Sequence, residues 1–137
     1  IHLIAAVPYE GFERSWDDDW KQCYHDALAA ADLVICRSGA STLAELEAAG
    51  KASILIPSPI VTGNHQFHNA NVLGKAGAAI VIEQKDVTNE LMIKTVKDLY
   101  EHREKLSDMS DNAVKLAVKD TNDRIYKVIK ELISKTK

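Results

Sequence analysis

The 137-residue sequence is 46% hydrophobic and carries a formal net charge of −3, which predicts one globular domain with a core of its own. An acidic balance argues against a nucleic-acid-binding protein, which usually presents a basic face, although it leaves room for a local positive site. The sequence contains no apolar run of the roughly 20 residues that a membrane-spanning helix needs.

The start of the chain and its cysteines bear on its cellular compartment. Residues 1–7 are apolar, but they lack the basic flank and cleavage site of a signal peptide. Because the first residue is an isoleucine inside a strand-like run, we expect the chain to be part of a longer protein. Cys23 and Cys36 stand in apolar surroundings without CxxC spacing, so we expect reduced, buried thiols in a cytosolic protein.

Short apolar runs alternate with helical patterns along the chain. The runs that predict buried strands are residues 2–7, 32–36, 52–57 and 78–83. The patterns that predict helices are residues 17–31, 41–50, 65–77, 88–103, 103–118 and 121–135, and Gly50 and Gly77 end two of them. Wholly apolar strands separated by helices indicate an α/β fold, with a parallel sheet covered by helices on both faces.

This fold predicts where a ligand binds, because open parallel sheets bind ligands outside the carboxyl ends of their strands. Three strand-to-helix joints fall at that edge, at residues 8–16, 37–42 and 58–65. We predict a single domain over residues 1–137, in which residues 1–87 form the βα units. The helices of residues 88–137 either cap the sheet or dock elsewhere.

The joint at residues 37–42 reads RSGAST. Gly39 permits a positive φ or a close backbone approach, although a tight turn needs no ligand. Ser41 and Thr42 fall in the first turn of the next helix, where unpaired N–H groups and the helix dipole form an anion site. Arg37 adds charged donors suited to phosphate, so this joint suits a diphosphate.

Glu45 lies one turn further along the same helix. It stands off the stripe of Leu43, Leu46 and Ala49, which we expect to face the sheet. Its carboxylate can accept two hydrogen bonds, which fits the paired hydroxyls of a ribose. The alternative is purely structural, because Thr42 and Glu45 also match the spacing of a capping box.

The joint after the next strand is also polar. Asn64, preceded by Thr62, can cap the following helix. The polar residues that share one face of its first turns are His65, Gln66 and Asn69. Donors and acceptors at the edge of the sheet suit the hydroxyls of a sugar, whereas the alternative is a solvated first turn.

Several other chemistries find little support in the sequence. His65 and His68 are three residues apart, but no cysteine or carboxylate stands beside them, so we do not expect a metal site. The chain contains no GK[ST] phosphate loop and no GxSxG nucleophile motif. The acidic WDDDW stretch is typical of a charged helix start.

Three separated stretches, ADLVICRSGASTLAELEAAGKASILIPSP, TGNHQFHNA and KAGAAIVIEQ, resemble the C-terminal half of the MurG family of bacterial peptidoglycan glycosyltransferases. The resemblance runs from about Ala31 to Gln84. It implies a Rossmann-like donor-binding domain of the GT-B type, cut short at its N-terminal side. The family transfers N-acetylglucosamine from UDP-N-acetylglucosamine to lipid I with inversion, which forms lipid II for peptidoglycan.

The resemblance assigns donor contacts to Arg37, Ser38, Gly39, Ala40, Ser41, Thr42, Glu45, His65, Gln66 and Asn69. The first three would form the turn beside the nucleotide, and the next three would present the helix N-terminus to the diphosphate. Glu45 would take the ribose hydroxyls. The last three would face N-acetylglucosamine, with His65 standing where the family has a glutamine.

The chain departs from the family in two further respects. Its loop at residues 8–22 is longer, so the uracil contact falls to Tyr9, to Trp20 or to the backbone near Lys21. The family's phosphate loop and its acceptor domain, which carries the expected catalytic base, have no counterpart in this sequence. The resemblance therefore implies a domain that binds the donor but holds no catalytic residue, metal or cofactor and turns over nothing unaided.

The implied partners follow from the same resemblance. They are UDP-N-acetylglucosamine, and lipid I through the absent domain, with no nucleic acid. The full-length protein would lie peripherally on the cytoplasmic face of the bacterial plasma membrane. Two alternatives stay open: a related glycolipid or exopolysaccharide transferase, and a non-catalytic donor-binding subunit that needs a partner chain.

Overall fold

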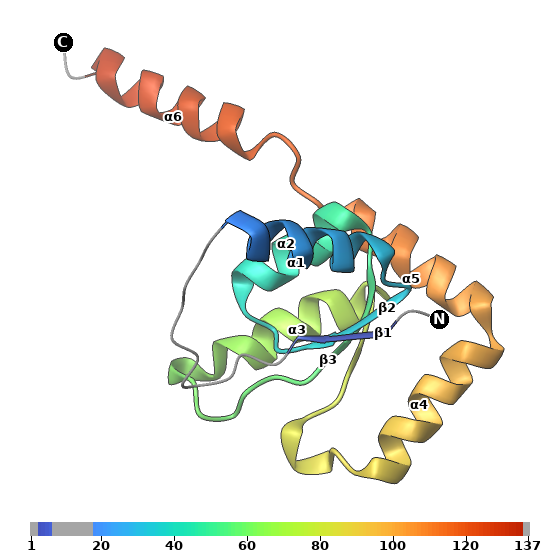
Figure 1. Cartoon of the computed structure of the whole chain (residues 1–137). Coiled ribbons are helices and arrows are strands. Elements are labelled where there is room, and N and C mark those ends of the chain that lie inside the picture. Colours follow the sequence, from blue (N-terminus) through green and yellow to red (C-terminus); the bar gives the residue numbers. More distant parts are fainter. Residues whose placement is uncertain (1–2, 7–17, 136–137) are drawn as a thin grey trace.

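The protein is described by a computed structural model that covers the backbone of residues 3–6 and 18–135 and the side-chain environments of residues 22–135. Its centre is a four-stranded sheet (Figure 1). The strands are β1 (Leu3–Ala6), β2 (Leu33–Cys36), β3 (Ala52–Leu55) and β4 (Ala79–Val81). They pair in parallel in the order β1-β2-β3-β4, which confirms the predicted parallel sheet.

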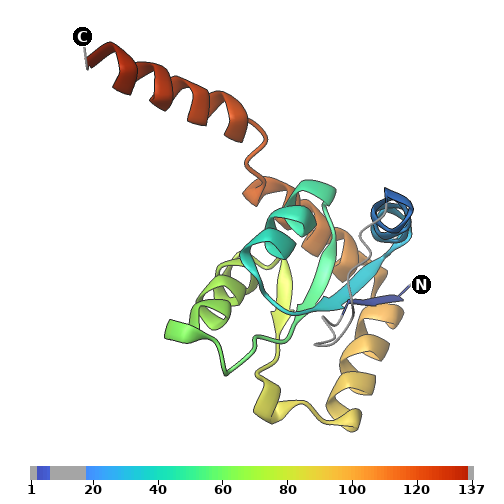
Figure 2. The same cartoon turned by 60° about the vertical axis from the view of Figure 1, so that its left-hand side comes forward.

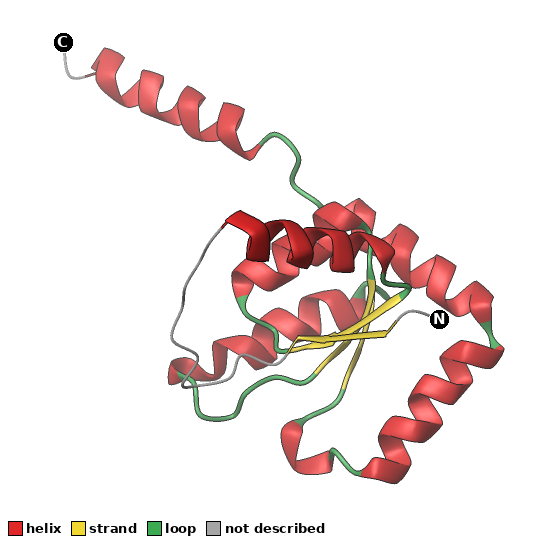
Figure 3. Cartoon of the chain, viewed as in Figure 1, coloured by secondary structure: helices red, strands yellow, loops and turns green. Residues whose placement is uncertain are grey.

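The helices alternate with these strands and then continue beyond them (Figure 3). Their bounds are α1 (Asp18–Ala30), α2 (Ala40–Ala49), α3 (His65–Lys75), α4 (Asn89–Glu101), α5 (Arg103–Leu116) and α6 (Thr121–Lys135). Two short 3-10 helices, η1 (Thr62–Asn64) and η2 (Gln84–Asp86), precede α3 and follow β4. Gly50 ends α2 in the left-handed conformation at φ 61°, as its place in the sequence predicted.

Alternation along the strands divides the core between the two faces of the sheet. Val34 and Leu55 pack with residues of α1, α2 and α3 on one face. Leu33 and Ile54 pack with residues of α4 and α5 on the other face. Figure 2 shows the sheet between these helices. The prediction of helices on both faces is therefore confirmed.

Two details of the predicted core are wrong. Ala49 is exposed although Leu43 and Leu46 are buried, because α2 ends at that residue and its last turn extends past the packed face. Cys23 is exposed, and only Cys36 is buried. The residues of α1 that turn toward the sheet are Tyr24 and Leu28, and Cys23 lies off that line. Both thiols are free, as expected.

The helix α6 extends away from the rest of the molecule (Figures 1 and 2). Its apolar side chains recur at helical spacing, yet Ile125, Ile129 and Ile133 are 52%, 48% and 60% exposed. Thus α4 and α5 cap the sheet, whereas α6 does not. No helix within the described residues has the length and apolarity needed to cross a membrane.

Deleting residues 119–137 is expected to change the free energy of unfolding by less than about 1 kcal/mol, because removal of surface residues usually has a small effect. All residues of α6 are exposed, including its apolar ones. Urea denaturation of both chains measures the difference. A loss above about 2 kcal/mol would show that α6 packs on the domain in solution.

Candidate functional site

The two polar joints after β2 and β3 lie side by side at one edge of the sheet. Cys36 and Leu55 are partners in the sheet, so the chain leaves both strands at the same edge. Ser38 is fully buried, and its Oγ donates a hydrogen bond to the backbone oxygen of Gln66 at 2.7 Å. Asn69 Nδ2 approaches the backbone oxygen of Ser38 at 3.5 Å. The start of α3 is thereby held against the turn that precedes α2.

Two of the predicted site residues hold the loop that follows β3. Arg37 donates from Nη1 to the backbone oxygen of Ile56 at 3.0 Å. Gln66 accepts at Oε1 from the backbone N–H of Ser58 at 2.9 Å. These bonds fix the loop between the two joints, so the structure gives both side chains a positioning role that their spacing in the sequence did not indicate.

The N-terminus of α2 has no side-chain cap among the residues that the structure describes. The helix begins at Ala40 after Gly39. Gly39 has φ −65° and ψ 145°, so the positive φ considered from the sequence is not adopted. Thr42 lies inside the helix rather than at its cap, and the capping-box interpretation is wrong. The first N–H groups of a helix have no intrahelical partners, so those of Ala40, Ser41 and Thr42 can meet an anion.

Glu45 is exposed, and its carboxylate is oriented by a tyrosine. The hydroxyl of Tyr24, on α1, donates to Glu45 Oε2 at 2.6 Å. Burial, and to a smaller extent the adjacent Glu45 carboxylate, raises the pKa of Tyr24 above its ordinary value. The phenol therefore stays protonated and keeps the O–H group that donates to Glu45. Among the described residues Oε1 of Glu45 has no hydrogen-bond partner, and it is free to accept from a ligand.

The remaining predicted residues lie at the start of α3. Asn64 precedes the helix with φ 51°, but its side chain makes no capping bond, so the predicted cap is wrong in that respect. His65 is exposed, and its Nδ1 lies 2.7 Å from the backbone oxygen of Thr62. No group of three metal-ligating side chains occurs among the residues that the structure describes.

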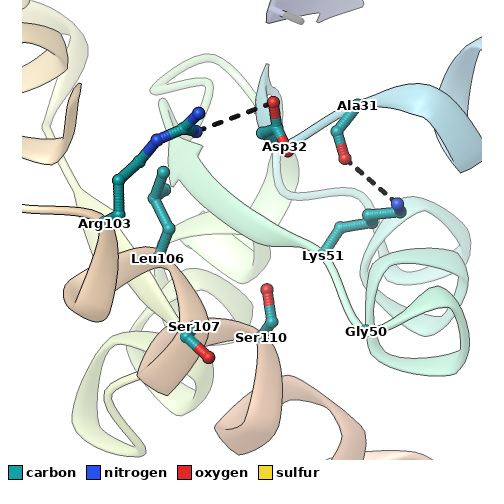
Figure 4. Close-up of a pocket in the computed structure, with 8 residues that line it drawn as sticks. All are labelled: Ala31, Asp32, Gly50, Lys51, Arg103, Leu106, Ser107 and Ser110. Carbon is teal, nitrogen blue, oxygen red and sulfur yellow. Dashed lines mark hydrogen bonds and ion pairs between the residues drawn. The ribbon is translucent and has the colours of Figure 1, made fainter. Parts of the chain in front are cut away.

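Two cavities lie at opposite edges of the sheet. The larger, about 420 Å³, is at the amino ends of β2 and β3, where Arg103 faces Asp32 and Lys51 bonds to Ala31 (Figure 4). The smaller, about 240 Å³, lies at the carboxyl ends of β3 and β4 and includes Asn64 and Phe67. The smaller cavity adjoins the predicted site, and the carboxyl edge is where parallel sheets bind ligands.

Sequence reasoning missed Tyr24 and Ser58. No local pattern links residue 24 to residue 45, because their contact depends on how α1 packs beside α2. Of the candidates for the uracil contact, Tyr9 and the side chain of Trp20 lie outside the described residues, whereas the backbone near Lys21 belongs to α1.

Comparisons with known proteins identify the family of the chain. Residues 19–125 match the family model described as the glycosyltransferase family 28 C-terminal domain. The chain is 54% identical over 107 residues to the UDP-N-acetylglucosamine--N-acetylmuramyl-(pentapeptide) pyrophosphoryl-undecaprenol N-acetylglucosamine transferase of Thermoanaerobacter sp. (strain X514), a match that covers 78% of this chain and 29% of the relative. It is 46% identical over 108 residues to the protein of the same name from Acetivibrio thermocellus, covering 79% of this chain and 29% of that one.

A solved structure gives the same result. The crystal structure of Acinetobacter baumannii MurG superimposes with a TM-score of 0.73 at 32% identity, covering 79% of this chain and 31% of that chain. The chain thus spans less than a third of the length of the relatives that it matches. The matched model, the sequence identity and the shared fold together show that this chain belongs to glycosyltransferase family 28, and that it matches the C-terminal domain of that family.

Proposed function

We propose that the chain binds the donor, UDP-N-acetylglucosamine, for a glycosyltransferase that transfers N-acetylglucosamine to lipid I. The observation that carries this proposal is the bond from buried Ser38 to the backbone of Gln66. This bond holds the N-terminus of α2 beside the polar start of α3, at the carboxyl edge of the sheet. The names of the relatives supply the identity of donor and acceptor.

The donor would lie along this edge in a defined order. Its ribose hydroxyls meet Glu45, and its diphosphate meets the N–H groups at the start of α2, near Arg37 and Ser38. Its sugar meets Gln66 and Asn69, with His65 at the rim. Each contact pairs a group of UDP-N-acetylglucosamine with hydrogen-bond donors or acceptors of the matching kind on the protein. The positive end of the α2 dipole favours the diphosphate.

This arrangement explains how the chain would assist group transfer. Negative charge develops on the diphosphate as it leaves the sugar, and preorganised N–H groups and hydroxyls stabilise that charge. The acceptor, its activating base and any contact with the membrane surface belong to other parts of the full-length enzyme. We therefore expect the 137-residue chain to bind the donor weakly and to transfer nothing by itself.

Replacing Glu45 by alanine is expected to weaken binding of UDP about tenfold, the lower end of the effect of a hydrogen bond to a charged group, because this site is exposed. Isothermal calorimetry with UDP on both chains measures the change. Glu47→Ala, on another side of α2, is the matched control and should bind like the unaltered chain. Equal binding by all three chains would remove the ribose role, and no binding by any would remove the proposed site.

Replacing Tyr24 by phenylalanine deletes the hydroxyl that orients Glu45. We expect affinity for UDP to fall about threefold to fivefold, as for loss of one modest hydrogen bond. The preference for UDP over 2′-deoxy-UDP should shrink at the same time. Tyr100→Phe on α4, where the residue is 59% exposed, controls for the loss of a hydroxyl. An unchanged preference in Tyr24→Phe would mean that Tyr24 only packs against the core.

A further inference from the structure

The larger cavity, of about 420 Å³, contains none of the residues assigned to the donor. It lies at the amino edge of the sheet, and its volume falls within the roughly 300–1,000 Å³ typical of small-molecule sites. Its walls come from the turns that follow α1 and α2 and from one side of α5. The polar residues that line it are Asp32, Lys51, Arg103, Ser107 and Ser110, so the cavity suits a polar ligand.

The Lys51 ammonium is held in place within this cavity. Its Nζ donates to the backbone oxygens of Ala29 at 2.7 Å and Ala31 at 3.0 Å. An ammonium has three N–H donors, and the third has no hydrogen-bond partner among the described residues. No carboxylate of those residues lies within ion-pair distance of Lys51. Because the side chain is already ordered, binding an anion there costs little further rotamer freedom.

Hydroxyl groups line the cavity from α5. Figure 4 shows the Ser110 hydroxyl pointing into the space between Leu106 and Lys51. Ser110 is half-buried, and its hydroxyl makes no hydrogen bond to another described residue. Ser107 lies one turn earlier on the same helix and also lines the cavity. An ammonium and nearby hydroxyls supply the donors that phosphate oxygens accept from.

Arg103 and Asp32 bring both signs of charge to the cavity. Arg103 Nη1 lies 3.8 Å from Asp32 Oδ2, which is beyond hydrogen-bond length. The lining side chains thus include two positive groups and one negative group, on a chain whose net charge is −3. This local excess of positive charge favours an anion, whereas a carboxylate beside a guanidinium can bind the hydroxyls of the same ligand.

The size and the charges of the cavity together indicate the class of ligand. A bare phosphate ion, only a few times larger than a water molecule of about 30 Å³, would leave most of the space empty. We propose that the cavity is a second binding site, which takes a phosphate monoester of a small polyhydroxyl molecule. The phosphate meets Lys51 and Ser110, and the hydroxyls meet Arg103 and Asp32. This site does not depend on the proposed function, because it lies at the opposite edge of the sheet.

Nuclear magnetic resonance of the isotope-labelled 137-residue chain in phosphate-free buffer tests the proposal. Glucose 6-phosphate is the probe, and it should shift the amides of Lys51, Ser107 and Ser110 in a saturable manner. Inorganic phosphate should bind the same residues at least about threefold more weakly, because it lacks the hydroxyls that make further hydrogen bonds. Glucose, which lacks the phosphate, should produce no saturable shift.

Two variants assign these shifts to the cavity. Lys51→Met removes the ammonium but keeps an apolar stem, and it should weaken binding of glucose 6-phosphate at least about tenfold, since hydrogen bonds to charged groups are the strong ones. It also removes the donor to Ala29 and Ala31. Ser110→Ala removes no bond between described residues and should weaken binding about threefold, so it tests the site even if Lys51→Met does not fold.

Lys115→Met is the matched control, because it makes the same change of charge in the last turn of α5, outside the cavity. It should bind glucose 6-phosphate like the unaltered chain. Equal weakening by Lys51→Met and Lys115→Met would show that only net charge matters and would overturn the proposal.

Two results of the titrations would also overturn it. The first is the absence of a saturable shift at Lys51, Ser107 and Ser110, including a response confined to Ala40 and Ser41 at the carboxyl edge. The second is equal affinity for inorganic phosphate and glucose 6-phosphate, which would leave a site for a bare oxyanion alone. Binding of UDP enters none of these measurements, so the proposed function stands or fails separately.

Discussion

Replacing Gly50 by alanine is expected to lower the free energy of unfolding by about 2–4 kcal/mol, which combines the cost of a left-handed non-glycine residue with that of overpacking. Gly50 ends α2 at φ 61°. An added Cβ would lie 2.6 Å from Cγ2 of Val114 on α5, so the Val114 side chain or the two helices would have to shift. Urea denaturation of the two chains measures the loss.

Gly63→Ala separates the two causes. Gly63 has a similar φ of 64°, but an added Cβ would meet no atom of the described residues within 4 Å. We expect this variant to lose only about 1–2 kcal/mol, the conformational cost alone. Equal losses in both variants would show that the contact with Val114 relaxes freely and that the packing of α2 on α5 is not tight.

Replacing Ser38 by alanine is expected to cost on the order of 1–2 kcal/mol, because the hydrogen bond from its buried hydroxyl to the backbone of Gln66 is lost. The Ser38 hydroxyl is fully buried and joins the two halves of the site through the backbone of Gln66. Affinity for UDP-N-acetylglucosamine should fall together with stability, since the start of α3 is no longer fixed beside α2. Thermal denaturation and calorimetry measure the two effects.

Ser53→Ala is the matched control for that variant. Ser53 is also fully buried, and within the described part of the chain its Oγ is the buried side-chain atom without a hydrogen-bond partner. Removing an unpaired buried hydroxyl deletes a desolvation cost, so this change should be neutral or slightly stabilising. If Ser38→Ala were as harmless as Ser53→Ala, the bond to Gln66 would not organise the site.

The fold was predictable from the sequence because its signals are local. Apolar runs such as LVIC and helical patterns between them indicate a parallel sheet without knowledge of any long-range contact. The same reasoning placed the two polar joints at one edge, and the bond between Ser38 and Gln66 shows that they meet. Gly50 was recognisable as a helix end, because glycine adopts the left-handed conformation at little cost.

The errors concern features that depend on packing or on an exact helix boundary. Thr42 and Glu45 have the spacing of a capping box, but α2 begins at Ala40 after Gly39, so Thr42 lies inside the helix and cannot cap it. Cys23 has apolar neighbours in the sequence, yet it lies off the line of Tyr24 and Leu28 that faces the core. The bond from Tyr24 to Glu45 joins two helices, and no local pattern encodes it.

The unequal environments of the two thiols make the chain suitable for attaching a probe at one position. Burial raises the pKa of Cys36 to about 12, so hardly any reactive thiolate forms there at neutral pH. Cys23 is exposed and precedes the tyrosine that orients Glu45. A maleimide dye should therefore label α1 without any engineered mutation, and its emission would report nucleotide binding from the neighbouring turn.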